Sequence, residues 1–166
     1  MPQIIPGLTG MVAVEVVYAR GHPNIKATHP TTLEVTREEH LTERGDCIIG
    51  VSASKAPRDF SESFKEALRS DRAVLVALII VGGLMDVVLA QGSSRLLLDS
   101  PVKLVIRRSS FIEPATIGVK ASKAARDIDR GIIAALRNPD TVVELKLYAL
   151  RLDEIESIYT GSRSIL

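Results

Sequence analysis

Residues 48–75 read IIGVSASKAPRDFSESFKEALRSDRAVL, and residues 116–143 read TIGVKASKAARDIDRGIIAALRNPDTVV. The two stretches align without a gap at an offset of 68 residues, and both contain SKA followed by RD. A match of this density inside one chain of 166 residues is not expected by chance. Self-similarity at a fixed offset is typical of a repeated structural unit. We therefore predict an internal duplication.

Apolar side chains recur at helical spacing in both copies. Every fourth residue is apolar, at Phe60, Phe64 and Leu68 and again at Ile128, Ile132 and Leu136. This spacing predicts two amphipathic helices, each with one apolar stripe on the core. We expect Asp59 with Glu62 to cap the first helix, Ser122 to cap the second, and Pro139 to end the second.

β-branched and alternating apolar segments surround both helices. The predicted strands are residues 11–19, 27–36, 47–53, 72–81, 84–91, 102–109, 116–121 and 141–151. Each half then reads β-β-β-α-β, which predicts an α+β, mainly β domain with about eight strands, two helices and pseudo-twofold symmetry. The strand pattern leaves one sheet, a sandwich and a barrel open.

We expect a short N-terminal arm, one duplicated domain and a C-terminal tail. The arm covers residues 1–10, the domain 11–151 with halves at about 11–81 and 84–151, and the tail 152–166.

Composition limits the classes of protein that the chain can belong to. A net charge of +1 with 25% charged residues gives a nucleic-acid binder no general basic excess. The start of the chain lacks a secretory signal, and no apolar run is long enough to cross a membrane. The single cysteine, Cys47, fits a reducing compartment, so we expect a cytoplasmic protein without a membrane partner. Two Asn and two Gln in the whole chain favour a thermophilic source.

All three histidines lie between Arg20 and Cys47. In an active site, a histidine would act as general base, Asp46 or Glu34 would orient it, and Asn24 would position the substrate. The candidate catalytic residues are therefore His22, Asn24, His29, His40 and Asp46. Their spacing matches no known metal motif, so no metal is expected.

A structural interpretation of the same residues competes with the catalytic one. His22 and Asn24 then form a turn, His29 ends a core-facing strand row, and His40 lies on a helical turn that Thr36 and Glu39 cap. At the offset of 68 residues, His22 aligns with Ala90, His29 with Leu97 and His40 with Arg108. The second half thus builds a similar unit without histidine, which favours a specialised role for the first.

The two SKAxRD segments are the second candidate site. Lys55 and Lys123 would lie at first turns of helices, where free N–H groups favour anions, and would bind phosphates of a nucleotide or RNA with Arg107 and Arg108. The competing interpretation is structural: Asp59 and Asp127 would pair with Lys55 and Lys123. With three Phe, three Tyr and no Trp, a platform for stacking bases is poorly supported.

The segments GHPNIKATHPTTLEVT (21–36), LTERGDCIIGV (41–51), VIRRSSF (105–111) and IGVKASKAARDIDRGI (117–132) resemble the archaeal family called domain of unknown function 371. The resemblance covers residues 12–150 and implies an archaeal protein with a mainly β domain and few helices. It implies no activity and no cofactor. Pro30 follows His29 where a basic residue is expected from the family.

Three hypotheses follow from the sequence. The first is an enzyme acting on a small molecule or nucleotide, with the histidines at its site and no assigned cofactor. The second is a non-catalytic RNA- or nucleotide-binding module that uses Lys55, Lys123, Arg107 and Arg108. The third is a structural subunit that forms homo-oligomers through the tail and a sheet edge.

Overall fold

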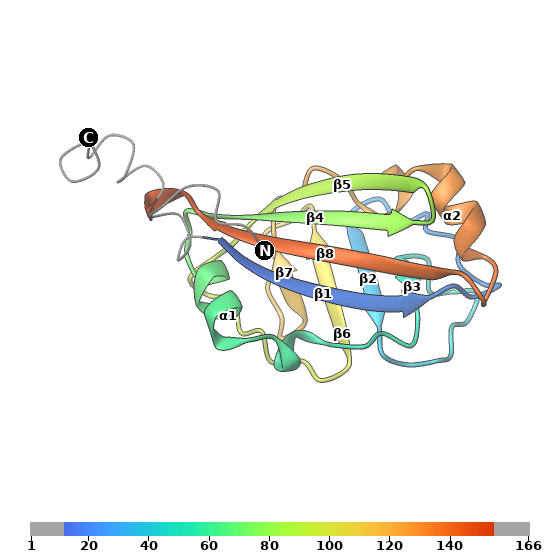
Figure 1. The fold of residues 1–166 in the computed structure, drawn as a ribbon, viewed down its shortest axis with the longest axis horizontal. Coiled ribbons are helices and arrows are strands. Elements are labelled where there is room, and N and C mark those ends of the chain that lie inside the picture. Colours follow the sequence, from blue (N-terminus) through green and yellow to red (C-terminus); the bar gives the residue numbers. More distant parts are fainter. Residues whose placement is uncertain (1–11, 155–166) are drawn as a thin grey trace.

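The computed structural model describes residues 12–154, and its strands form two four-stranded sheets that face each other (Figure 1). The strands are β1 (Val12–Arg20), β2 (Thr32–Thr36), β3 (Ile48–Gly50), β4 (Ala73–Val81), β5 (Leu84–Gln91), β6 (Lys103–Arg107), β7 (Thr116–Gly118) and β8 (Val142–Arg151). The helices are the 3-10 turns η1 (Pro57–Asp59) and η2 (Ala125–Asp127) and the α-helices α1 (Glu62–Leu68) and α2 (Arg130–Leu136). The domain is α+β and mainly β, as the sequence predicts, and the sheets do not close into a barrel.

The two sheets have different patterns of pairing. Sheet A has the order β1-β8-β4-β5 and is antiparallel throughout. Sheet B has the order β3-β2-β6-β7, with β2 and β6 antiparallel and the outer strands β3 and β7 parallel to their neighbours. The first four strands correspond in position to the last four, β1 to β5, β2 to β6, β3 to β7 and β4 to β8. Replacing each strand by its counterpart reverses the strand order of both sheets. Strands of the two halves therefore alternate in sheet A.

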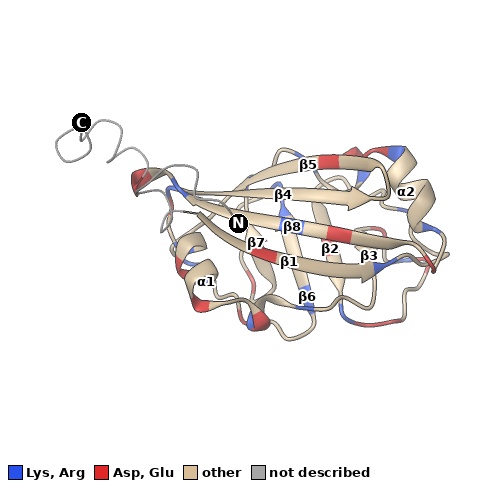
Figure 2. Ribbon diagram, viewed as in Figure 1, with Lys and Arg blue, Asp and Glu red and all other residues tan. Residues whose placement is uncertain are grey.

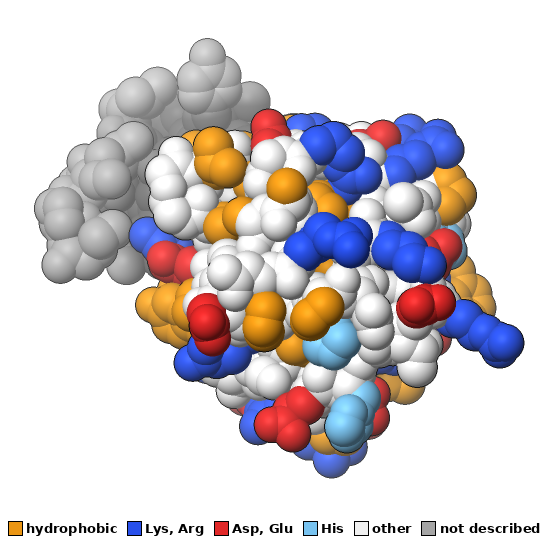
Figure 3. All heavy atoms as spheres, turned by 90° about the vertical axis from the view of Figure 1, so that its right-hand side faces the viewer, with side chains coloured by type: hydrophobic (Ala, Val, Ile, Leu, Met, Phe, Trp, Pro, Cys, Tyr) orange, Lys and Arg blue, Asp and Glu red, His pale blue; other side chains and the backbone are white. Residues whose placement is uncertain are grey.

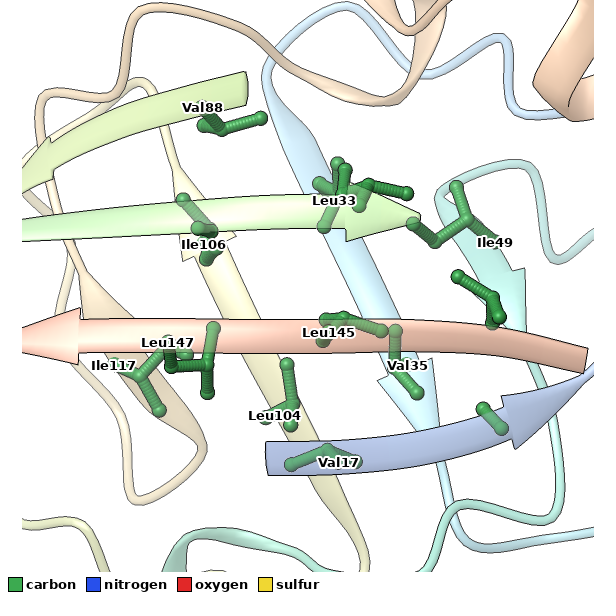
Figure 4. Close-up of a cluster of buried hydrophobic side chains, with 14 of the residues drawn as sticks. Val17, Leu33, Val35, Ile49, Val88, Leu104, Ile106, Ile117, Leu145 and Leu147 are labelled. Atoms are coloured by element: carbon green, nitrogen blue, oxygen red, sulfur yellow. The ribbon is translucent and has the colours of Figure 1, made fainter. Parts of the chain in front are cut away.

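The core lies between the sheets, and both contribute large aliphatic side chains to it (Figure 4). On β4 and β8 every second residue is buried, which is the period of a strand with one face on a core. The strand β4 lies between β8 and β5, in the central position that its apolar sequence indicates. Phe60 and Phe64 add an edge-to-face contact with ring centroids 5.1 Å apart beside α1.

Several local predictions are wrong, and backbone conformation explains them. The strand predicted from residue 27 begins only at Thr32, because Ala27 has a left-handed φ of 50° that ends extended pairing. Residues 37–40 form no helical turn, and the Thr36 hydroxyl accepts a hydrogen bond from the Glu38 N–H instead. The helix caps are Ser61 for α1 and Asp129 for α2, so neither Ser122 nor the pair of Asp59 and Glu62 has that role.

The first SKAxRD segment binds the edge strand β1. The Ser54 N–H donates to the Tyr18 carbonyl at 2.8 Å, and the Tyr18 N–H donates to Ser54 Oγ at 2.9 Å. Lys55 Nζ lies 2.6 Å from Oε1 of the buried Glu15, whose Oε2 accepts the Ser61 N–H at 2.6 Å. We call Glu15, Lys55 and the Ser61 amide the first carboxylate latch.

The second copy of the segment binds β5 in the same way. The Ser122 N–H donates to the Leu89 carbonyl, and the Leu89 N–H donates to Ser122 Oγ. Lys123 forms an ion pair with Asp86, whose Oδ2 accepts the Asp129 N–H at 2.8 Å. Ser122, like Ser54, thus pairs with part of an otherwise open sheet edge. The second latch of Asp86, Lys123 and the Asp129 amide, like the first, holds the residue that caps the following helix.

The aspartates of the repeated segments cap the 3-10 turns. Asp59 Oδ2 accepts the Ala56 N–H at 3.0 Å and pairs with Arg37 at 2.8 Å. Asp127 Oδ2 accepts the Ala124 N–H at 2.9 Å and pairs with Arg108 at 3.1 Å. Asp59 and Asp127 thus form ion pairs within the chain, as the structural interpretation predicts, but with Arg37 and Arg108. The predicted partners, Lys55 and Lys123, pair with acids on the edge strands instead.

Gly21 and Gly92 lie where two stretches of backbone approach closely. A Cβ on Gly92 would lie 2.3 Å from the Leu68 carbonyl oxygen, and one on Gly21 would lie 2.2 Å from that of Asn138. We predict that Gly21→Ala and Gly92→Ala each lower the free energy of unfolding by about 1–3 kcal/mol, because backbone must shift to admit the methyl group. Urea titration measures this, and Gly83→Ala, where a Cβ meets nothing within 4 Å, is the control. Equal stability of all three variants would contradict the close approach.

The second latch makes a pH-dependent contribution to stability. Burial raises the pKa of Asp86, but hydrogen bonds from Lys123, Asp129 and Val87 outweigh it and hold the pKa below the usual aspartate range. The stabilisation is therefore complete above the unfolded-state pKa of about 4 and is lost as pH falls through the lower folded-state value. We predict that Asp86→Asn flattens the fall in unfolding free energy below about pH 4 and costs about 1–3 kcal/mol at neutral pH. Chemical denaturation between pH 2 and 7 tests this against Asp140→Asn, and identical slopes would contradict it.

Candidate functional site

The histidine-bearing segment consists of two loops that lie against each other. Asn24 Nδ2 donates to the Leu41 carbonyl at 2.8 Å, and Lys26 Nζ donates to the Glu43 carbonyl at 2.6 Å. The N–H groups of Thr28 and His29 donate to the Asp46 carbonyl at 2.9 and 3.1 Å. The fold therefore brings the loop of residues 21–31 beside residues 41–47.

Two of the three histidine rings hold backbone turns. His22 Nδ1 accepts the Asn24 N–H at 3.0 Å. His29 Nδ1 accepts the N–H groups of Thr31 and Thr32 at 3.1 and 3.0 Å. A nitrogen that accepts from a backbone N–H carries no proton, so in a neutral ring the proton is on Nε2. Both rings then present a donor outward and no free lone pair, an arrangement that suits hydrogen-bond donation better than proton abstraction.

The other predicted site residues lie nearby but make no shared network. His40 is exposed, and the half-buried Asp46 joins the loops through its main-chain carbonyl. Within residues 12–154, no hydrogen bond joins the side chains of any two of His22, Asn24, His29, His40 and Asp46. In the same range, no three His, Cys, Asp or Glu side chains are grouped so as to hold a metal ion. The catalytic role of these five residues stays a prediction.

Serines of the second half make the hydrogen bonds that the histidines make in the first. Ser93 Oγ accepts the Arg95 N–H at 3.1 Å, as His22 does from Asn24. Ser100 Oγ accepts the N–H groups of Val102 and Lys103 at 3.2 and 3.3 Å, as His29 does from Thr31 and Thr32. The sequence alignment of His22 with Ala90 and of His29 with Leu97 is therefore wrong, because the first half has three more residues between Leu41 and Asp46.

The four basic residues of the proposed twin phosphate sites all have partners within the chain. Lys55 and Lys123 belong to the carboxylate latches and precede α1 and α2 by several residues, so they are not in the first turn of either helix. Arg108 pairs with Asp127 at 3.1 Å. Arg107 pairs with Glu113 at 3.0 Å and lies 5.0 Å from the centre of the Phe111 ring. These contacts give the repeated residues a structural role.

Cys47 and Glu34 form a half-buried pair at the edge of sheet B. Cys47 Sγ lies 3.6 Å from Glu34 Oε1, and Lys103 Nζ lies 3.9 Å from the same oxygen. Burial raises the pKa of Glu34 despite the nearby lysine. Burial, followed by the charge of Glu34, raises the pKa of Cys47 to about 12, so the thiol stays protonated at neutral pH.

A polar cleft of about 250 Å³ lies at the opposite end of sheet A from the histidines. It opens where β5 ends, and its floor includes Gly92 and the antiparallel bridge between Gln91 and Val119. Ile112 contributes one apolar wall. The remaining polar side chains in its lining are Asp71, Ser93, Arg95, Ser110 and Lys120.

The charges in this cleft favour an anion. Within residues 12–154, no carboxylate forms an ion pair with Arg95 or Lys120. The one acid in the lining, Asp71, accepts the Ser94 N–H at 2.9 Å and its hydroxyl at 3.2 Å. The Ser94 N–H is the main cause that lowers the pKa of Asp71, with a smaller contribution from Arg95. The cleft therefore offers two cations and several hydroxyl and amide donors.

The cleft and the histidine loops occupy corresponding places in the two halves. Gly92 follows β5 as Gly21 follows β1, and the bridge of Gln91 with Val119 corresponds to that of Arg20 with Val51. Figure 3 looks onto the histidine end, where histidines appear as separate spots with both acidic and basic side chains around them. The cleft was missed from the sequence because its lining combines separate segments around Asp71, Arg95, Ser110 and Lys120, which match no motif.

Comparisons with known proteins place the chain in a family. The structure is a two-sheet α+β domain with a small polar cleft, and within residues 12–154 every helix is too short or too polar to cross a bilayer. Residues 17–150 match the family model described as Domain of unknown function (DUF371), so the chain belongs to this family. It is 45% identical over 122 residues to "Uncharacterized protein MJ0206" of the archaeon Methanocaldococcus jannaschii, covering 74% of this chain and 90% of that protein. The family resemblance seen in the sequence is confirmed.

The raised pKa of Cys47 predicts slow alkylation. Because the thiolate is the reactive species, native Cys47 at pH 8 should react with iodoacetamide about 100-fold more slowly than the unfolded chain. Glu34→Gln removes the second cause of the shift and should speed the reaction several-fold. Mass spectrometry follows the labelling, and native labelling as fast as that of the unfolded chain would contradict the assignment.

Proposed function

We propose that the protein binds a small anionic molecule in the cleft of Arg95 and Lys120. The observation that carries the proposal is the presence of these two cations, without an ion-pair partner in residues 12–154, around one pocket. Charged side chains that donate to an anion form strong hydrogen bonds, and Ser93 and Ser110 add hydroxyl groups beside them.

The size of the cleft limits the ligand. A volume of about 250 Å³ lies at or below the lower end of the usual range for ligand sites. It holds about eight water molecules at about 30 Å³ each. A phosphate or carboxylate on a short carbon skeleton fits this space, whereas a dinucleotide or a folded RNA does not.

We further propose that the two halves descend from one duplicated unit with pseudo-twofold symmetry. The reversed strand orders, the paired carboxylate latches and the matching turns of His22 with Ser93 and His29 with Ser100 support this origin. Under this proposal the cleft at the end of β5 kept serine, arginine and lysine. The corresponding place at the end of β1 acquired histidine and asparagine.

An enzymatic site at the histidine loops is the second candidate. The observation that favours it is the fixed orientation of His22 and His29, whose Nδ1 atoms are both held by backbone N–H groups. In such a site the histidines would donate hydrogen bonds from Nε2 to a substrate oxygen. The RNA- or nucleotide-binding alternative is less well supported, because Lys55, Lys123, Arg107 and Arg108 are in ion pairs.

Calorimetry with the full chain tests the anion site. Inorganic phosphate, pyrophosphate and citrate serve as probes at low ionic strength, where screening is weak. We expect saturable binding of at least one probe to one site per chain. Arg95→Gln and Lys120→Gln should each weaken it about ten-fold, because a charged hydrogen bond contributes about 1.5–3 kcal/mol.

A matched control variant distinguishes binding in the cleft from general electrostatic attraction between the anion and the protein. Lys26→Gln removes one positive charge from the histidine end, where the Lys26 ammonium group contacts only a backbone carbonyl among the described residues. Its affinity for the probe should equal that of the unaltered chain. An equal loss in all three variants, or no binding of any probe at millimolar concentration, would contradict the proposal.

A further inference from the structure

The outer face of sheet A is a broad apolar surface. Figure 1 shows β5, β4, β8 and β1 in the nearest layer, with no described helix in front of them. The strand register aligns the outward residues in rows, such as Val14, Tyr148, Val76 and Leu89. The apolar side chains of this face are Val12, Val14, Val16, Tyr18, Val74, Val76, Leu78, Ile80, Met85, Val87, Leu89, Val142, Tyr148 and Leu150.

Sheet B does not share this exposure. Residues of β2 and β6 are buried on both faces of that sheet, since Thr32, Thr36 and Val105 are as inaccessible as the core residues beside them. On sheet A, by contrast, Val14, Leu89 and Met85 expose 49%, 49% and 60% of their surface. Exposed apolar patches of this extent on a folded domain usually mark an interaction site.

Among the described residues, charge on the face is confined to Glu144 and Lys146 on β8 and to Arg20 at the end of β1. Glu144 and Lys146 are both on β8, with Lys146 Nζ 3.8 Å from Glu144 Oε2. Figure 2 shows the front strands with few charged residues. Of those, Glu15 and Asp86 belong to the carboxylate latches. The face thus carries one acid and one base near its centre, two residues apart, and a second base, Arg20, at the end of β1.

We propose that this face binds a second copy of the chain. A twofold axis between two facing sheets places the partner's Lys146 opposite Glu144, and the reverse contact follows from the symmetry. The Glu144 and Lys146 pair near the centre of the face is therefore self-complementary, whereas a purely acidic or basic centre would repel its copy. The apolar rows on either side pack face to face at about 10 Å, the usual spacing of stacked sheets.

The area of the face reaches the size of a small specific interface. Four strands about 4.8 Å apart, each with about eight residues at about 3.3 Å, cover about 500 Å² of flat sheet. Two such faces bury about 1,000 Å² or more together, because side chains make the surface uneven. This reaches the lower range of specific protein interfaces.

Sedimentation equilibrium of the full chain tests the dimer. At micromolar concentration the expected mass is twice the 18.0 kDa of one chain. Val76→Glu introduces a charge into the central rows and should give a monomer. Leu97→Glu, at an apolar residue that is 52% exposed outside sheet A, is the control and should stay dimeric. Circular dichroism checks that each variant is folded.

A charge exchange makes the test specific to the proposed geometry. Lys146→Glu brings like charges together across the axis and should weaken the dimer at least ten-fold. Adding Glu144→Lys restores one acid and one base and should restore the dimer. A monomeric unaltered chain would overturn the proposal. So would a dimer that resists Val76→Glu and Lys146→Glu, since it would form through another surface.

Discussion

The two carboxylate latches connect the repeated sequence to the fold. Each joins a carboxylate on an edge strand of sheet A, a lysine of the SKA segment and the amide of a helix N-cap residue. A carboxylate that is mostly removed from water needs such partners, because an unpaired buried charge is strongly destabilising. The latches therefore hold the N-cap residues of α1 and α2. The neighbouring Ser54 and Ser122 pair with the edge strands at which sheet A could otherwise bind another chain.

The central elements of the fold could be predicted from sequence, since they depend on periodicity. The alternation along β8 and the four-residue spacing of Phe60, Phe64 and Leu68 reflect burial of one face, which is a local property. The strand β5 was predicted with its observed bounds for the same reason. The start of β2 was missed because the left-handed backbone of Ala27 leaves no trace in side-chain type.

The candidate site depends on contacts that sequence patterns do not record. The histidines were predicted to be functional because they occur in one half only. Ser93 and Ser100 form the corresponding turns in the second half, so these turns need only a side-chain hydrogen-bond acceptor. The cleft could not be predicted because its lining comes from four separate segments, one in the first half at Asp71 and three in the second half. Residues shared by the halves thus build the fold, and positions that differ between them, such as Asn24 and Arg95, are where specific binding is expected.

The claim that the shared residues build the fold, whereas the ligand binds in the cleft of Arg95 and Lys120, is tested most directly by nuclear magnetic resonance. The full chain is titrated with pyrophosphate. Shifted amide signals should cluster at Gly92, Arg95 and Lys120, while those of the SKA segments at Lys55 and Lys123 stay in place. Shifts centred on His22 and His29, or on both SKA segments, would contradict it and move the site to the histidine loops or to the repeated motif.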